Sequence, residues 1–244
     1  MPECPVDRRR MHVPLDSCAT RLRIATYNVH QWVGADGRPR VGRILSVIRG
    51  LEADVIALQE VLLPWRGFTI ADLARETGME AIPGRTLNRG DAEYGNALLT
   101  TVPIRSVQGV NLTVSPFEPR GAILASLTVD GLPVGVAATH LGRRLRERMR
   151  QVRALMRYVE ALQGVTILLG DLNEWIPVSP VLRRLWETFG RQPAPASFPA
   201  RFPVLALDRI LARPPAFARP PRAVATRAAR RASDHLPVQA TLCV

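Results

Sequence analysis

Hydrophobic positions in this chain fall mainly into short runs of the length that β-strands have. Residues 22–29 (LRIATYNV) alternate well enough for a strand, and residues 54–61 (DVIALQEV) and 165–171 (VTILLGD) have the continuous apolar pattern of buried strands. Asp130–Gly131 is a strong hairpin signal between two further runs. The remaining predicted strands cover 96–100, 122–130, 133–140, 207–212 and 237–244.

Helical spacing of the apolar residues predicts three helices between these strands. The first contains Val41, Ile44, Leu45 and Ile48 and ends at Gly50. The clearest spans 145–162 and is closed by Gly164, and Ser179 is the expected N-cap of a short third helix that reaches Phe189. We expect the opposite face of the second helix to be solvated; it carries Arg144, Arg148, Arg150, Arg153 and Arg157.

The chain shows no internal repeat and no low-complexity linker long enough to divide it. Residues 1–20 are expected to form a flexible polar tail, and residues 190–206, rich in Pro, an ordered loop. We therefore predict one domain over 21–244 with mixed strands and helices, in a chain of 244 residues.

Composition narrows the class of partner without fixing it. The hydrophobic share of 47% is enough for a sizeable core, and the formal net charge is +12. All 33 basic residues are Arg, which is typical of codon bias in a GC-rich genome, so the charge has two open explanations. Either it is compositional, or it favours anionic partners such as nucleic acid, phosphorylated metabolites or acidic lipid head groups.

The cysteines and the lengths of the apolar runs indicate in which cellular compartment the protein is expected. Cys4, Cys18 and Cys243 lie near the chain ends without CxxC spacing, which argues against a disulfide scaffold and against a zinc site. Residues 1–20 contain no apolar signal-peptide core, and no run reaches the roughly 20 apolar residues that a membrane span needs. We expect a cytoplasmic protein that is not integral to a membrane.

Polar side chains gather where the predicted strands end, and ligands tend to bind where a sheet runs out into loops. Each alone is commonly a turn or cap residue. Together they offer hard oxygen ligands without sulfur, as Mg²⁺ or Mn²⁺ prefers, and His140 and His235 can donate to phosphate oxygens or transfer protons. Asp208 is a plausible orienting carboxylate for one of these histidines. The oxygen ligands are Asn28, Glu60, Asp171, Asn173 and Asp234.

The order of these motifs resembles the endonuclease/exonuclease/phosphatase superfamily, the deoxyribonuclease-like metal-dependent phosphohydrolases. The matching segments run through nearly all of residues 22–244. They are TYNVH (26–30), LQEV (58–61), YGNALLT (94–100), THL (139–141), GDLNE (170–174), LDRIL (207–211) and SDHLPV (233–238). RG (120–121), THLG (139–142) and SFPARFPVLALDRI (197–210) resemble a small bacterial branch of it.

This resemblance implies a fold and a set of roles. The fold is an α/β (α+β) four-layer sandwich, with two packed mixed β-sheets flanked by helices. Glu60 is implied as the principal metal ligand, with Asn28 and Asp234, and His235, oriented by Asp208, as the general base. Asp171 is implied to position the nucleophile or assist proton transfer, and Asn173 and His140 to bind phosphate oxygens. Asn96, Arg120 and Trp175 are the expected substrate-binding residues.

The predicted function is Mg²⁺-dependent hydrolysis of phosphoester bonds, with phosphodiesters of DNA or RNA as the first substrate class. The alternatives are a phospholipid or phosphometabolite hydrolase and a non-catalytic nucleic-acid-binding protein of the same fold. Trp32, Trp65 and Trp175 follow predicted site strands and either stack on a substrate or pack internally. We expect a monomer.

Overall fold

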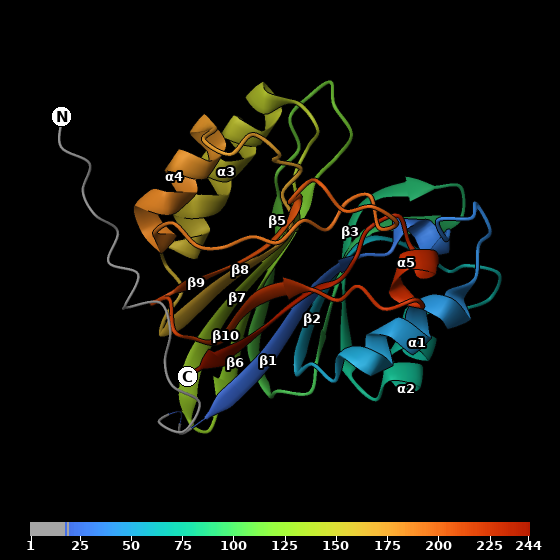
Figure 1. Ribbon diagram of the computed structural model, residues 1–244, viewed down its shortest axis with the longest axis horizontal. Helices are drawn as coiled ribbons and strands as arrows, with labels where there is room; N and C mark the ends of the chain where they lie inside the picture. The colour runs from blue at the N-terminus through green and yellow to red at the C-terminus, as the bar shows by residue number, and fades with distance from the viewer. Residues whose placement is uncertain (1–17, 19) are drawn as a thin grey trace.

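The computed structural model describes residue 18 and residues 20–244, and it has two β-sheets packed face to face (Figure 1). Helices α3 and α4 cover the outer side of one sheet, and α1, α2 and α5 lie outside the other. The predicted four-layer sandwich is confirmed.

The first sheet has six strands in the order β10-β11-β1-β2-β4-β3. β1 and β2 are parallel, and β11 pairs with β1 antiparallel, so the chain ends beside its first strand. The strands are β1 (Arg21–Asn28), β2 (Val55–Leu63), β3 (Glu80–Arg89), β4 (Ala92–Thr100), β10 (Phe217–Ala223) and β11 (Val238–Cys243).

The second sheet has five strands in the order β5-β6-β7-β8-β9, with β7 and β8 parallel. Each sheet therefore has a parallel pair, and it is at the carboxyl ends of these pairs that polar residues gather. The strands are β5 (Ile104–Asn111), β6 (Gly121–Val129), β7 (Leu132–His140), β8 (Val165–Asp171) and β9 (Asp208–Arg213).

Two of the helices begin at residues whose side chains cap the helix N-terminus. Thr69 and Asp72 form a capping box on α2, and the Ser179 hydroxyl accepts a hydrogen bond from the Leu182 amide on α4, as predicted. The helices are α1 (Val41–Leu51), α2 (Ile70–Thr77), α3 (Leu145–Val159), α4 (Pro180–Phe189) and the short α5 (Ala229–Ala232), with a 3₁₀ turn at His30–Trp32.

Three apolar cores separate the four layers. The central core lies between the two sheets and includes Ile24, Leu98 and Ile210. The outer cores lie under the helices, one around Trp32 and Ile48 and the other around the α3 and α4 residues that face the second sheet. Each sheet packs against an apolar core on both of its faces. Because consecutive residues of a strand point to opposite faces, both are apolar, which explains the nearly continuous apolar runs in the sequence.

All the strands and helices predicted from the sequence are present, with ends shifted by a few residues, and the loop over 190–206 contains no helix or named strand. Three strands were not predicted: β3, β5 and β10. All three are sheet edges. The side chains of β3 and β5 are largely exposed or half-buried, and β10 has two prolines and two arginines among seven residues, so the apolar alternation that signals a strand is weak. Helices α2 and α5 were also missed, since they are short.

Two expectations are wrong. Cys18 and Cys243 form a disulfide with a Cα–Cα distance of 5.4 Å, because β11 returns the chain end to the start of β1. Arg148 is buried although its helix face was expected to be solvated, since its guanidinium pairs with the buried Glu174 carboxylate. The predicted tail over 1–20 falls almost entirely outside the described residues. Within the described part of the chain, no helix is long and apolar enough to cross a membrane.

Candidate active site

The strand register brings the predicted site residues to one edge of the sandwich. His140, Asp171 and Asp208 are register partners on the neighbouring strands β7, β8 and β9. Asn28 ends β1 in the other sheet, and its side-chain amide lies 3.1 Å from Asp171 Oδ2. The two sheets therefore meet through polar contacts where their parallel strands end.

Gly170 allows this close approach. Its φ is 150°, and a Cβ built there would lie 1.8 Å from the Thr139 carbonyl oxygen of β7. Only glycine fits, because a side chain would collide with a neighbouring backbone that cannot give way. The pairing of β7 with β8, which places His140 beside Asp171, therefore requires glycine at position 170.

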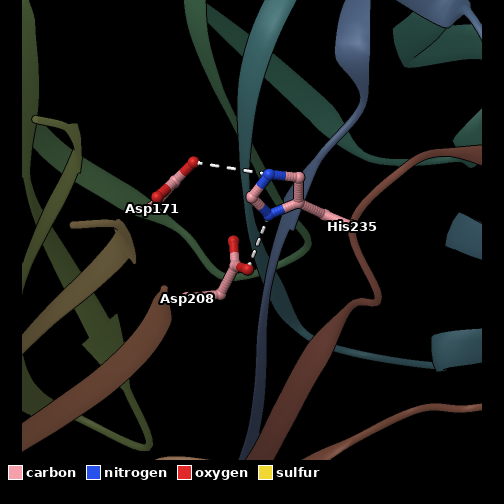
Figure 2. Close-up of side chains that lie close together, drawn as sticks. All are labelled: Asp171, Asp208 and His235. Atoms are coloured by element: carbon pink, nitrogen blue, oxygen red, sulfur yellow. Dashed lines mark hydrogen bonds and ion pairs between the residues drawn. The ribbon is translucent and has the colours of Figure 1, made fainter. Parts of the chain in front are cut away.

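Asp208 and His235 form a buried hydrogen-bonded pair that faces Asp171 (Figure 2). Asp208 Oδ2 accepts a hydrogen bond from His235 Nδ1 at 2.8 Å and one from the Ser197 hydroxyl at 2.6 Å. His235 Nε2 lies 3.8 Å from Asp171 Oδ2. Because the carboxylate holds the proton on Nδ1, the neutral ring presents the lone pair of Nε2 toward Asp171.

Charge around His235 favours its protonated form. Burial of the ring opposes protonation, but the carboxylates of Asp208, Asp171 and Asp234 outweigh it and raise the pKa of His235 to about 10. In the absence of a cation the ring therefore carries a proton on both nitrogens at neutral pH. A positive charge near these carboxylates would act in the opposite direction.

His140 is held neutral by its surroundings. Burial and the neighbouring Arg120 guanidinium lower the pKa of His140 to about 3. Arg120 Nη1 lies 3.2 Å from Nδ1 and Asn173 Nδ2 lies 3.1 Å from Nε2, so donors flank the ring on both sides. The neutral ring has one lone pair and can accept from only one of these donors, and a protonated ring could accept from neither, which agrees with the lowered pKa.

Asn28 bridges two acidic side chains. Its Nδ2 donates to Glu60 Oε1 at 3.2 Å and to Asp171 Oδ2 at 3.1 Å, while its Oδ1 accepts from the His30 amide at 3.0 Å. The side chain therefore turns its amino group, not its oxygen, toward Glu60. Asn28 thus links the Glu60 and Asp171 carboxylates, and its expected role as a metal ligand stays a prediction.

Glu60 and Asp234 have the chemistry of a hard-cation site. Glu60 lies at a bulge of β2, with φ of 56°, which aims its side chain out of the sheet. Its second carboxylate oxygen makes no hydrogen bond to any residue that the structure describes. Asp234 is about a third exposed, at 36%, and lines the same cleft. Two carboxylates open to solvent suit Mg²⁺, which keeps several water ligands.

Another group of possible metal ligands is buried: Asp171, Asp208 and His235 have ligand atoms within 4.8 Å of one another. The same three residues could also transfer protons, because the histidine lies between two carboxylates. Asp208 Oδ2 already accepts hydrogen bonds from His235 Nδ1 and from the Ser197 hydroxyl, whereas its buried Oδ1 has no hydrogen-bond partner among the described residues.

The site opens into a cleft of about 1010 Å³. Its wall includes Glu60, Asp234 and His235, together with the cationic side chains Arg89, Arg120, Arg143 and Arg144. Acidic residues at the centre and arginines around them suit a phosphate group held next to a divalent cation.

The three expected substrate-binding residues have different positions. Arg120 and Trp175 line the cleft, and Trp175 is about half exposed, at 47%, with the Arg148 guanidinium 5.0 Å from its ring. Asn96 does not line this cleft; it is buried, and its amide donates to the Gly121 carbonyl at 3.0 Å. Its geometry supports a positioning role for the strand that follows Arg120. Of the other tryptophans, Trp32 is fully buried and Trp65 is partly buried against the same core.

Several residues of the site were not singled out from the sequence. Ser197 binds Asp208, the Phe198 ring packs 4.8 Å from the His235 ring, and His30 lies 3.6 Å from Asp234. All three lie in the motifs TYNVH and SFPARFPV. The sequence therefore contained a signal for these residues, but it did not indicate their roles. Glu174, the last residue of GDLNE, holds Arg148 beneath Trp175.

The comparisons with known proteins agree with this geometry. A model of the Endonuclease/Exonuclease/phosphatase family matches residues 25–235. Over 91% of this chain and 96% of its relative, the chain is 28% identical to the uncharacterized protein YbhP of Escherichia coli K12.

Two solved structures share the fold. One is an endonuclease/exonuclease/phosphatase from Beutenbergia cavernae, with a TM-score of 0.72, 24% identity, and coverage of 92% of this chain and 72% of that one. The other, from Bacteroides vulgatus, has a TM-score of 0.73, 19% identity, and coverage of 91% and 98%. With a family match over most of its length, the chain belongs to the endonuclease/exonuclease/phosphatase family of phosphoester hydrolases.

Proposed function

We propose that this protein is a Mg²⁺-dependent hydrolase of phosphodiester bonds. The observation that carries the proposal is the buried Asp208–His235 pair, which faces Asp171 at the floor of a cleft that also presents Glu60 and Asp234. Hydrolysis of a phosphodiester needs an oriented water, neutralised phosphate oxygens and a proton for the leaving oxygen. These residues can supply all three.

In this proposal His235 Nε2 takes the proton of the attacking water, while Asp208 holds the ring in place. The water oxygen bonds to phosphorus as the ester bond to the leaving oxygen breaks, and the departing oxygen takes up the proton that His235 accepted, passed on through water in the cleft. Asp171, 3.8 Å from Nε2, orients the water. Arg120, Asn173 and the neutral His140 bind the non-bridging phosphate oxygens.

Glu60 and Asp234 would hold the cation. Bound there, Mg²⁺ supplies positive charge that stabilises the phosphate oxygens. The same charge favours the neutral form of His235, which as general base has to be unprotonated. Asn28 keeps the Glu60 and Asp171 carboxylates at the distance that its two hydrogen bonds set.

Polynucleotides are the first proposed substrate class. Arg143 and Arg144, which follow β7 directly, line the cleft, and Arg144 lies over the Phe117 ring at 5.1 Å. The exposed face of Trp175 can stack on a base. Arginine and aromatic side chains along one cleft are typical of single-strand binding.

Phospholipids are the second candidate, and a specific observation favours them. Large apolar side chains are exposed next to residues that line the cleft, since Ile176 follows Trp175 and Val204 precedes Leu205, and aliphatic groups do not stack on bases.

A substrate panel tests the proposal: bis-p-nitrophenyl phosphate, plasmid DNA, single strands, RNA, phospholipids and inositol phosphates, each with Mg²⁺ and with EDTA. We expect Mg²⁺-dependent release of product from the small diester and from at least one of the polymer or lipid substrates. Binding of nucleic acid without hydrolysis of any diester would identify instead a non-catalytic protein of this fold.

We expect a monomer. The Cys18–Cys243 disulfide favours an oxidising compartment over the cytoplasm that the sequence predicted, because such bonds persist mainly in oxidising compartments.

A further inference from the structure

Exposed apolar side chains are concentrated in two loops that also contribute residues to the cleft wall. Five of the nine large hydrophobic residues that are exposed in the described part of the chain lie in two loops. One loop follows β8 and carries Trp175, Ile176 and Val178; the other carries Phe202 and Val204, which are 79% and 74% exposed. Exposed apolar residues that cluster in this way mark a contact surface more often than single ones do.

Both loops border the same cleft and are held in place. Trp175 of the first loop and Phe198 and Leu205 at the base of the second line it. Glu174 Oε1 accepts a hydrogen bond from the Ile176 amide at 3.0 Å. In Figure 1 the segment between α4 and β9, in orange, runs along the upper edge of the sandwich from α4 toward α5.

The tip with Phe202 is also pinned. The Val204 amide donates to the Phe198 carbonyl at 2.9 Å, and the Ala200 amide donates to the Asp234 carbonyl at 2.6 Å. The backbone here is fixed by hydrogen bonds, and the side chains of Phe202 and Val204 are nevertheless exposed, so both are available for contact with a partner.

A basic hollow lies next to this tip. It has a volume of about 540 Å³ and is lined by Arg201, Arg227, Arg230, Arg231 and one acid, Asp36. Asp36 is already paired with Arg43 at 2.7 Å. Arg230 donates to the carbonyls of residues 200 and 201, whereas the guanidinium groups of Arg201, Arg227 and Arg231 make no ion pair with any described residue. The hollow therefore has an uncompensated positive charge.

We propose that these two loops and the arginine hollow form a docking surface for the interface of an anionic phospholipid bilayer. The apolar tips enter the head-group region, and the arginines bind lipid phosphates beside it. The interface of an anionic bilayer has lipid phosphates next to apolar chains, which complements arginines next to exposed apolar side chains. The surface of a folded soluble protein rarely has both groups in this arrangement.

A polynucleotide fits this surface less well. It would satisfy the arginines and give Phe202 a base to stack on, but Ile176, Val178 and Val204 would remain in water beside a hydrated backbone. A bilayer satisfies both the charged and the aliphatic groups.

The inference deepens the proposed function, on which it rests: a protein docked in this way would direct its cleft to phosphoesters at the membrane surface. Docking and hydrolysis can nevertheless be measured separately, so failure of one is distinguishable from failure of the other.

The test is co-sedimentation of the full chain with vesicles of phosphatidylcholine alone and of an equimolar mixture with phosphatidylglycerol. We expect stronger binding to the mixed vesicles. Arg227→Gln/Arg231→Gln should reduce this binding about 25-fold, at roughly fivefold for each arginine. Phe202→Ser/Val204→Ser should reduce it about tenfold.

A matched control is Arg150→Gln/Arg153→Gln on the exposed face of α3, which removes the same charge and should change binding less than about twofold. All variants should hydrolyse bis-p-nitrophenyl phosphate as the unmodified chain does and should keep its melting temperature. Equal losses in the control and the loop variants would overturn the proposal. So would binding of a single-stranded oligonucleotide, but not of mixed vesicles, that depends on Arg227 and Arg231. Vesicle binding without hydrolysis of any diester would leave the docking surface standing and remove the proposed function.

Discussion

Replacing Asp208 by Asn isolates what the buried carboxylate does for His235. The substitution keeps the volume and removes the charge. Asp208 Oδ2 accepts hydrogen bonds from both His235 Nδ1 and the Ser197 hydroxyl. An amide oxygen in the place of Oδ2 can still accept both hydrogen bonds but carries no negative charge, so the ring loses a large part of the attraction that raises the pKa of His235 and that favours the proton on Nδ1.

The expected loss in kcat is about 10²- to 10⁴-fold, the range in which orienting carboxylates act, or about 3 to 5 kcal/mol of activation free energy. Because the removed charge favours the protonated ring, the acidic limb of the kcat–pH profile should move to lower pH. Ser197→Ala is the matched control: it removes one hydrogen bond to Asp208 but leaves the charge, so its loss should be no more than about tenfold.

The assay is steady-state hydrolysis of bis-p-nitrophenyl phosphate by Asp208→Asn, His235→Ala and the double variant. If the pair acts as one unit, the double variant should be little slower than His235→Ala alone. Fully additive losses, or an unchanged pH profile in Asp208→Asn, would refute the coupling.

Three other predictions follow from the site. The folded-state pKa of His140 is lowered to about 3, so the neutral ring stabilises the folded protein fully above the unfolded pKa near 6.5. As pH drops from there toward 3, the free energy of unfolding should fall by up to about 1.4 kcal/mol per pH unit. In urea unfolding, His140→Gln should show a weaker fall with pH, and an equal fall in both proteins would contradict the assignment. Glu174→Gln should destabilise the metal-free protein by about 3 to 5 kcal/mol, since it leaves the buried Arg148 unpaired, and Arg148→Met/Glu174→Met should cost clearly less. If polynucleotide binds the cleft, Arg143→Gln/Arg144→Gln should lower the slope of log affinity against log salt by about 0.7 to 0.9 for each lost phosphate contact, and an unchanged slope would exclude these side chains from the contact.

Much of the fold was accessible from the sequence because both sheets are buried on both faces. Their central strands are apolar runs of strand length, which the sequence pattern identifies directly. The edge strands β3, β5 and β10 lack this signal, since one side of each is open to solvent and their side chains are mixed.

The site was predictable as a set of residues but not as a geometry. The sequence indicated that Asp208 orients His235, and the 2.8 Å contact agrees with it. It did not indicate that Asn28 turns its amino group toward Glu60, because that depends on which acceptor the His30 amide finds. It also missed the buried state of Arg148, since helical periodicity places a side chain on a face without saying what packs over that face.

The central claim is that Glu60 holds a cation on which phosphodiester hydrolysis depends. The most direct measurement is a Mg²⁺ titration of bis-p-nitrophenyl phosphate hydrolysis by metal-free protein, compared with Glu60→Gln of the same fold and melting temperature. We expect no turnover in EDTA, saturable recovery with Mg²⁺, and for Glu60→Gln a Mg²⁺ requirement raised at least about tenfold. Full turnover by metal-free protein, or identical Mg²⁺ curves for the two chains, would contradict it.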